Sequence, residues 1–206
     1  MIEITNEDNM ELMARYPDNH FELAIVDPPY GIETKGNAQD RFRMNKDLSL
    51  INDNKPNTLY FEELFRVSKN QIIWGYNHLS DLLPSCREFI FWNKHNPVVT
   101  FSDGELAWTS FLGTAKCFDY SFMKAIRDNK NQKIHPTQKT YKLYEWLLTN
   151  YAKENDKILD THLGSGSIAI ACHNMKYDLT ACELDTEYYN AALKRLKQHT
   201  DQQRLF

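Results

Sequence analysis

A strand that two prolines cut short constrains the fold of this chain more than any other feature. The apolar run 21–26 has the length of a buried strand, and Asp27-Pro28-Pro29-Tyr30 follows it directly. Because proline lacks the N–H that the next ladder hydrogen bond needs, the strand must stop there. In an open α/β sheet, ligands bind outside the carboxyl ends of the strands. The tetrapeptide brings a carboxylate, unpaired carbonyls and an aromatic ring to such an end, which suits a flat base that carries an amino group.

Apolar segments along the chain alternate between strand-like and helix-like patterns. We expect strands at 1–5, 21–26, 71–75, 88–92, 105–112, 157–160 and 178–182, and helices near 10–13, 58–67, 78–83, 136–147, 168–175 and 186–199. This alternation predicts an α/β fold with a mostly parallel sheet and helices on both faces. Two segments show no clear period. We expect residues 31–57 to form a mobile loop over the site, and residues 113–135 are considered below.

Composition is that of an ordinary globular protein. With 206 residues, 42% hydrophobic and 25% charged, the chain can bury one sizeable core, so we expect a single domain. No apolar run approaches the roughly 20 residues of a membrane span, and no secretory signal opens the chain. We therefore expect a cytoplasmic protein with no membrane partner. The four cysteines show no C-x-x-C spacing, which favours buried thiols over a metal site.

Basic residues concentrate in one part of a chain whose net charge is −4. The overall charge argues against non-specific coating of nucleic acid but allows a local basic face. Between residues 116 and 142 there are seven basic side chains and two acidic ones, and Phe118, Tyr120 and Phe122 occupy alternate positions. Residues 113–135 are therefore a candidate segment for contacting phosphates and bases. A solvated loop that buries one aromatic face is the alternative.

A second motif lies where the strand 157–160 runs into Leu163-Gly164-Ser165-Gly166 and a helix start. Glycines let the backbone approach a ligand, and Ser165 or Ser167 would cap the helix. Glu183 ends the next strand, where a carboxylate can accept both ribose hydroxyls of a nucleoside cofactor, although it could also be a solvated strand end. Alone, this pattern fits nicotinamide and S-adenosylmethionine equally. The proline tetrapeptide favours the methyl donor, because a dinucleotide leaves it unexplained.

Together the motifs resemble those of the amino-methylating, S-adenosylmethionine-dependent DNA methyltransferases, in the permuted class whose D-P-P-Y precedes the cofactor motif. The resemblance rests on residues 27–31, His135-Pro136-Thr137-Gln138-Lys139, residues 160–166, and the amino-terminal strand with Asp8. It implies a Rossmann-like sheet in circularly permuted order, in which strand 1–5 completes the sheet beside the strand that ends at Glu183. The chain departs from the family pattern at Thr140, where family members commonly have proline, and at Thr161 and His162, where they commonly have proline and an aromatic residue. We expect His162 to be a pocket wall or a satisfied surface histidine.

The resemblance also implies roles for individual residues. Catalysis would rest on Asp27, Pro28, Pro29 and Tyr30, which would orient an adenine amino group flipped out of the duplex and stack on its ring. The implied cofactor-binding residues are Asp8, His135, Thr137, Gln138, Lys139, Asp160, Leu163, Gly164, Ser165, Gly166 and Glu183. Lys139 would lie near the cofactor carboxylate or the substrate backbone. Asp8 would lie near the cofactor adenine, and a helix-capping role is equally open to it.

We therefore expect a site-specific DNA methyltransferase that transfers a methyl group from S-adenosylmethionine to N6 of adenine. The alternatives are N4 of cytosine in DNA and N6 of adenine in RNA. Two further hypotheses come from other functional classes: a catalytically silent nucleic-acid-binding subunit and a nicotinamide oxidoreductase. The sequence leaves open the recognised DNA site, the choice between monomer and homodimer, and whether a partner restriction nuclease exists.

Overall fold

The computed structural model of the chain describes residues 1–31, 54–96, 102–128, 134–135 and 137–203. The strands are β1 (Ile2–Thr5), β2 (Phe21–Val26), β3 (Ser68–Trp74), β4 (Phe89–Asn93), β5 (Gly104–Thr109), β6 (Lys116–Asp119), β7 (Lys157–Asp160) and β8 (Asp178–Cys182). The helices are α1 (Asn9–Ala14), α3 (Thr58–Val67), α4 (Tyr76–Leu79), α5 (Phe122–Asp128), α6 (Tyr141–Tyr151), α7 (Ser167–Met175) and α8 (Thr186–Gln203).

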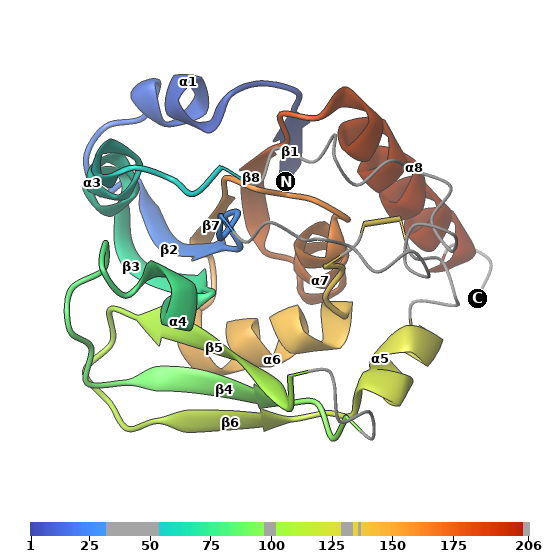
Figure 1. Cartoon of the computed structure of the whole chain (residues 1–206). Coiled ribbons are helices and arrows are strands. Elements are labelled where there is room, and N and C mark those ends of the chain that lie inside the picture. The colour runs from blue at the N-terminus through green and yellow to red at the C-terminus, as the bar shows by residue number, and fades with distance from the viewer. Residues whose placement is uncertain (32–53, 97–101, 129–133, 136, 204–206) are drawn as a thin grey trace.

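The strands form one eight-stranded sheet with the order β1-β8-β7-β2-β3-β5-β4-β6 (Figure 1). Neighbouring strands are parallel except at β5, which runs antiparallel to both β3 and β4. This arrangement confirms the predicted α/β fold with a mostly parallel sheet. The amino-terminal strand β1 pairs with β8 from the other end of the chain, with Ile4 opposite Ala181, as the permuted order predicts.

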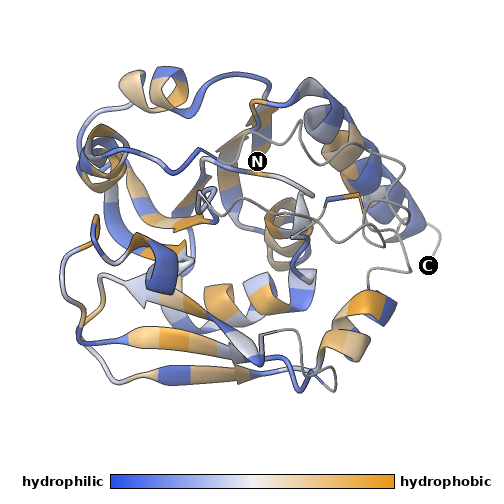
Figure 2. Ribbon diagram, viewed as in Figure 1, coloured by the Kyte–Doolittle hydropathy of each residue, from blue (hydrophilic) through white to orange (hydrophobic). Residues whose placement is uncertain are grey.

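Helices cover both faces of the sheet because its central strands are apolar on both sides. In β2, Leu23 and Ile25 pack into the cluster formed with α6 and α7, whereas Ala24 and Val26 pack into the cluster formed with α1 and α3. Successive side chains of a strand point to opposite faces, so one apolar run serves both layers. Figure 1 shows α7 between α6 and α8, and Figure 2 shows how apolar the central strands are.

The segment 113–135 differs from its predicted irregular structure, because it contains β6 and α5. These elements have four and seven residues, which is too short for a periodic pattern to be recognised. The helix expected from residue 136 begins instead at Tyr141, since the Thr140 side chain caps it by accepting the N–H of Lys142 at 3.3 Å. Most of the loop predicted at 31–57 lies outside the described residues, and Asn57 caps α3.

The prediction of buried cysteine thiols is confirmed for only some of the four residues. Cys172 and Cys182 are buried and Cys86 is half-buried, whereas Cys117 is exposed on β6, the last strand at its edge of the sheet. All four are thiols. No helix within the described ranges combines the length and the apolar character that crossing a membrane requires.

Leu159 in β7 offers a test of the two-sided core, because its side chain is fully buried in the cluster that the sheet forms with α1 and α3. Leu159→Ala removes buried methyl groups and leaves a cavity, so we expect a loss of about 3 kcal/mol in the free energy of unfolding. Leu112→Ala is the matched control, since Leu112 is 77% exposed, and should change that free energy by under about 0.5 kcal/mol. Urea titrations followed by circular dichroism measure both. Equal losses would contradict the assigned core.

Candidate active site

Three adjacent parallel strands each bring a carboxyl group to the same edge of the sheet. Asp27 follows the last residue of β2, Asp160 ends β7, and Glu183 follows the last residue of β8. Burial raises the pKa of Asp160 to about 8, and the neighbouring charges of Asp27 and Glu183 act in the same direction. This edge of the sheet therefore favours a ligand that brings positive charge.

Asp160 and Glu183 both keep hydrogen-bonding capacity for a ligand. Oδ1 of Asp160 accepts the N–H of His162 at 2.9 Å, and within the described ranges no lysine or arginine forms an ion pair with this carboxyl. Glu183 accepts the N–H of Gly164 at 2.8 Å and that of Asp185 at 3.0 Å, one on each oxygen. Burial raises the pKa of Glu183, and these two backbone bonds oppose the rise. A carboxylate oxygen has two lone pairs, so each oxygen of Glu183 can accept one more donor.

The glycine turn between β7 and α7 leaves backbone open to a ligand. Gly164 and Gly166 have positive φ angles of 52° and 71°. The nearest atoms that a Cβ added to Gly164 would meet belong to the His135 ring, at 3.8 Å, which is ordinary van der Waals contact. Gly166 is the N-cap residue of α7 and no side chain caps this helix, so the prediction of a serine cap is wrong. The hydroxyl of Ser167 instead donates to the carbonyl of Lys139 at 2.7 Å, which ties the turn to the motif that precedes α6.

Other residues of the predicted cofactor set brace this turn. Leu163 is buried, and its N–H donates to the carbonyl of Cys182 at 3.0 Å, which joins the turn to β8. Ser165 is buried, and its carbonyl accepts from Arg195 of α8 at 2.7 Å. The sequence pattern predicted Leu163 and Ser165 as cofactor-binding residues, whereas the contact with Arg195 was not predicted. The turn is therefore fixed to two neighbouring elements.

The motif at 135–139 folds against the glycine turn. The ring of His135 packs edge-on against Tyr188 of α8 with centroids 4.5 Å apart, and it faces Gly164. The Thr137 hydroxyl lies 3.1 Å from His135 Nδ1, and Gln138 Oε1 accepts the N–H of Ile134 at 2.9 Å. Pro136 lies outside the described residues. The structure therefore brings His135, Thr137 and Gln138 to the region that the sequence predicted for the cofactor.

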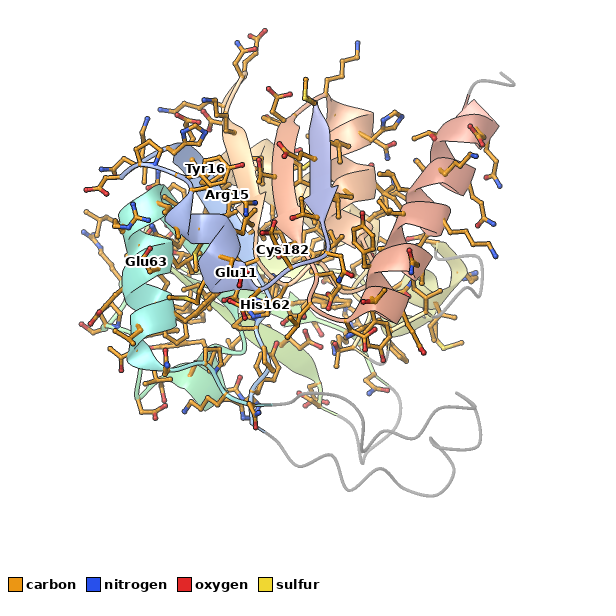
Figure 3. The ribbon with its side chains drawn as sticks, turned by 90° about the horizontal axis from the view of Figure 1, so that it is seen from above. Glu11, Arg15, Tyr16, Glu63, His162 and Cys182 are labelled. Atoms are coloured by element: carbon orange, nitrogen blue, oxygen red, sulfur yellow. The ribbon has the colours of Figure 1, made fainter. Side chains whose placement is uncertain are left out.

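Asp8 caps α1, because its side chain accepts the N–H of Met10 at 2.7 Å. The next residue, Asn9, hydrogen-bonds to His162 Nε2 at 3.2 Å, and Figure 3 shows His162 and Cys182 close to α1. Burial lowers the pKa of His162 to about 4, so its ring is neutral at pH 7. His162 thus forms a neutral wall beside Asp160, which is one of the roles expected for it.

Asp27 is engaged by two other side chains. The Tyr30 hydroxyl donates to Oδ1, and the Lys139 ammonium donates to Oδ2. Lys139 is 3% exposed, and its nitrogen also lies 3.2 Å from Oε2 of Glu105 in β5. Burial acts against the charged form of Lys139, but Asp27 and Glu105 outweigh burial and raise its pKa. Lys139 therefore remains an ammonium beside the catalytic candidate Asp27, a contact that the sequence did not predict.

The Tyr30 ring lies against the turn that opens α4. It stacks on His78 with centroids 5.3 Å apart and an interplanar angle of 15°. A Cβ at Gly75 would overlap the ring, and Gly75 has a φ of 81°, so glycine alone fits there. Gly75 ends the strand predicted at 71–75, and a glycine at a strand end was the one sequence signal for this contact. Glu105 carried no such signal, because its strand is antiparallel and distant in the chain.

The aromatic residues of segment 113–135 divide between core and surface. Phe118 is buried and Tyr120 stacks on it, with centroids 5.4 Å apart, whereas Phe122 and Met123 of α5 are 38% and 57% exposed. The alternative of a buried aromatic face therefore holds for Phe118 and Tyr120. Phe122 remains available at the surface together with the exposed Lys124 of α5.

The family model N6_N4_Mtase, described as DNA methylase, matches residues 73–194. The chain belongs to this family. Among curated relatives of this methyltransferase, the type II methyltransferase M.HpaI of Haemophilus parainfluenzae is 25% identical over 91% of this chain and 71% of its own length. The type II methyltransferase M.HinfI of Haemophilus influenzae is 23% identical over 95% of this chain and 68% of its own length. These findings confirm the resemblance to the amino-methylating, S-adenosylmethionine-dependent DNA methyltransferases.

Solved structures share the fold of this methyltransferase. The M1.HpyAVI–SAM complex superimposes with a TM-score of 0.66 at 20% identity, over 95% of this chain and 100% of that one. The cytosine-N4-specific PvuII DNA methyltransferase gives a TM-score of 0.63 at 13% identity, over 97% of this chain and 90% of that one. The Rossmann-like sheet predicted from the sequence is therefore confirmed.

The raised pKa of Asp160 predicts how the stability of this methyltransferase changes with pH. The folded state retains the Asp160 proton up to about pH 8, whereas the unfolded state loses it near the ordinary aspartate pKa. Ionisation of the unfolded state therefore destabilises the wild type as pH rises through this window. Asp160→Asn removes the effect, and its side-chain oxygen can still accept the N–H of His162. We expect the difference in melting temperature between Asp160→Asn and wild type to grow in favour of the variant as the pH rises from about 5 to about 8. A gap that does not change with pH would contradict this assignment.

Proposed function

We propose that this methyltransferase transfers a methyl group from S-adenosylmethionine to the exocyclic N6 amino group of adenine in DNA. The observation that carries the proposal is the position of Asp27 at the carboxyl end of β2, in one row with Asp160 and Glu183. Aspartate in the first position of the D-P-P-Y motif favours adenine within the resemblance described above. The proposal also treats the 206 residues as one methyltransferase domain.

Asp27 and Pro28 provide the acceptors that amino methylation needs. The lone pair of an adenine amino group is delocalised into the ring, which makes the nitrogen a poor nucleophile. The Asp27 carboxylate and the Pro28 carbonyl can each accept one amino hydrogen, so that the lone pair turns away from the ring plane. Pro29 stiffens the backbone that carries both acceptors, and Tyr30 provides an aromatic plane for a base flipped out of the duplex.

The residues around the glycine turn fit S-adenosylmethionine, which supplies the methyl group when it is bound. Asp160 is a buried carboxyl whose raised pKa a neighbouring cation would lower, so it suits the ammonium group of the cofactor. Glu183 retains acceptor capacity for ribose hydroxyls, and Gly164 leaves its backbone open beside His135. Leu163, Ser165 and Gly166 shape the turn. We assign Asp8, Thr137 and Gln138 to the same cofactor.

Methylation of cytosine N4 is the second candidate. One neighbour in structure is the PvuII DNA methyltransferase, which its title describes as cytosine-N4-specific, and its TM-score of 0.63 is close to that of M1.HpyAVI. Cytosine also presents an exocyclic amino group with two hydrogens, so the acceptors at Asp27 and Pro28 would serve it equally. We place recognition of the DNA in segment 113–135, where α5 exposes Phe122, Met123 and Lys124.

The identity of the methylated nucleoside tests the proposal directly. The protein is incubated with isotopically labelled S-adenosylmethionine and unmethylated duplex DNA, single-stranded DNA or RNA, and the products are digested to nucleosides. We expect label in N6-methyldeoxyadenosine from duplex DNA, identified by mass spectrometry. Label in N4-methyldeoxycytidine would support the second candidate. The absence of label from all three substrates would contradict the proposed activity.

Replacement of Asp27 separates catalysis from cofactor binding. Asp27→Ala removes an acceptor that the amino group needs, so we expect the turnover number to fall by at least about 100-fold. The dissociation constant of S-adenosylmethionine, measured by calorimetry, should change little. Because Asp27→Ala leaves the Lys139 charge without this partner, Asp27→Asn is the companion variant, which keeps the shape and one acceptor oxygen. Near-normal turnover of Asp27→Ala would contradict the role of Asp27.

A further inference from the structure

Asp27 already accepts one hydrogen bond on each carboxylate oxygen, and pairing with an ammonium weakens it as an acceptor for the substrate amino group. Its Oδ1 accepts from Tyr30 and its Oδ2 accepts from the Lys139 ammonium. An ammonium at this position also opposes the reaction, because the substrate nitrogen becomes positive as it gains the methyl group. The Tyr30 hydroxyl is neutral and carries no such penalty. Release of Lys139 from Asp27 therefore favours methyl transfer, whereas release of Tyr30 is not needed.

Glu105 offers Lys139 a second place to bind. Its Oε2 is buried and, among the described residues, accepts no well-aligned hydrogen bond, although Lys139 Nζ lies only 3.2 Å away. Its Oε1 is occupied by the ammonium of Lys94. Burial favours the neutral form of Glu105, but the charges of Lys139 and Lys94 outweigh it and lower its pKa. Glu105 is thus an ionised carboxylate with one oxygen left to be satisfied.

We propose that Glu105 is a positioning residue that takes the Lys139 ammonium from Asp27 when the target amino group binds. This inference rests on the proposed amino-methyltransferase function. No covalent bond changes in the step, and Asp27, Glu105, Lys139 and Lys94 sum to zero charge before and after it. The ammonium turns from Asp27 Oδ2 to Glu105 Oε2, and the freed lone pair of Asp27 accepts an amino hydrogen. Glu105 then holds the positive charge of Lys139 away from the nitrogen that is methylated.

Kinetics of Glu105→Gln test this role. Without the Glu105 charge, Lys139 stays on Asp27, so we expect the turnover number on unmethylated duplex DNA to fall by roughly 10- to 100-fold, the value of one hydrogen bond between charged groups. The KM for DNA and the calorimetric dissociation constant of S-adenosylmethionine should change less than about twofold, because Glu105 binds neither ligand. Glu145→Gln is the matched control, since Glu145 pairs with Lys142 at 2.9 Å on α6; its turnover number should stay within about twofold of wild type.

A double variant tests whether the low turnover number of Glu105→Gln comes only from a folding defect. Glu105→Gln leaves Lys94 without its partner, so Lys94→Gln combined with Glu105→Gln restores charge balance in the outer pair. We expect this double variant to melt close to wild type yet to retain the low turnover number. Recovery of wild-type turnover in the double variant would overturn the proposal, because Lys139 would still lack its charged acceptor.

A crystal structure of the complex with S-adenosylhomocysteine and a short unmethylated duplex that contains the target sequence shows the position of Lys139 directly. Lys139 Nζ should then lie within hydrogen-bond distance of Glu105 Oε2 and away from Asp27 Oδ2. Lys139 still bound to Asp27, or a turnover number of Glu105→Gln equal to that of Glu145→Gln, would overturn the inference and leave the proposed function intact. A wild-type protein that methylates no nucleic acid would remove the proposed function and this inference together.

Discussion

Parallel pairing of β8, β7 and β2 is the constraint on which the rest of the site depends. It places Asp160 beside the strands that Glu183 and Asp27 directly follow, and three carboxyl groups at one sheet edge cannot all be ionised without compensation. The chain compensates each one differently. Asp160 keeps its proton, Glu183 receives two backbone N–H groups, and Asp27 receives the Lys139 ammonium.

Because of these differences, the three carboxyl groups differ in how readily they can bind a ligand. Asp160 can ionise when a cation arrives, and Glu183 can accept further donors without losing those it has. Asp27 becomes the stronger acceptor when its ammonium partner moves away. Asp160 and Glu183, the carboxyls assigned to the cofactor, therefore form no ion pair among the described residues, whereas Asp27, the acceptor for the amino group, is paired with Lys139. Two acidic groups, Asp27 and Glu105, lie within ion-pair distance of one buried lysine, which is the geometry that the proposed change of partner needs.

The sequence predicts the parts of this arrangement that depend on local pattern. Apolar runs located β2, β3, β7 and β8, and the proline and glycine punctuation placed Asp27 and Gly164 at strand ends. Long-range contacts were beyond such reasoning. Glu105 reaches Lys139 only because β5 runs antiparallel beside β3, and no local period specifies that pairing. Short elements such as α5 were missed for the related reason that seven residues show too little periodicity.

The departures from the family pattern at Thr161 and His162 follow from the same electrostatics. A proline after Asp160 would stiffen the backbone covalently, whereas Thr161 and His162 stiffen it through hydrogen bonds. Thr161 Oγ1 lies 2.7 Å from the Tyr60 hydroxyl of α3, and His162 bonds to Asn9 of α1. Burial keeps the His162 ring neutral although it lies next to Asp160, so it adds rigidity without adding charge. A charged ring at this position would favour the ionised form of Asp160 and pair with the very carboxyl that we assign to the cofactor. A neutral histidine, bound at both ring nitrogens, leaves that carboxyl for the ligand.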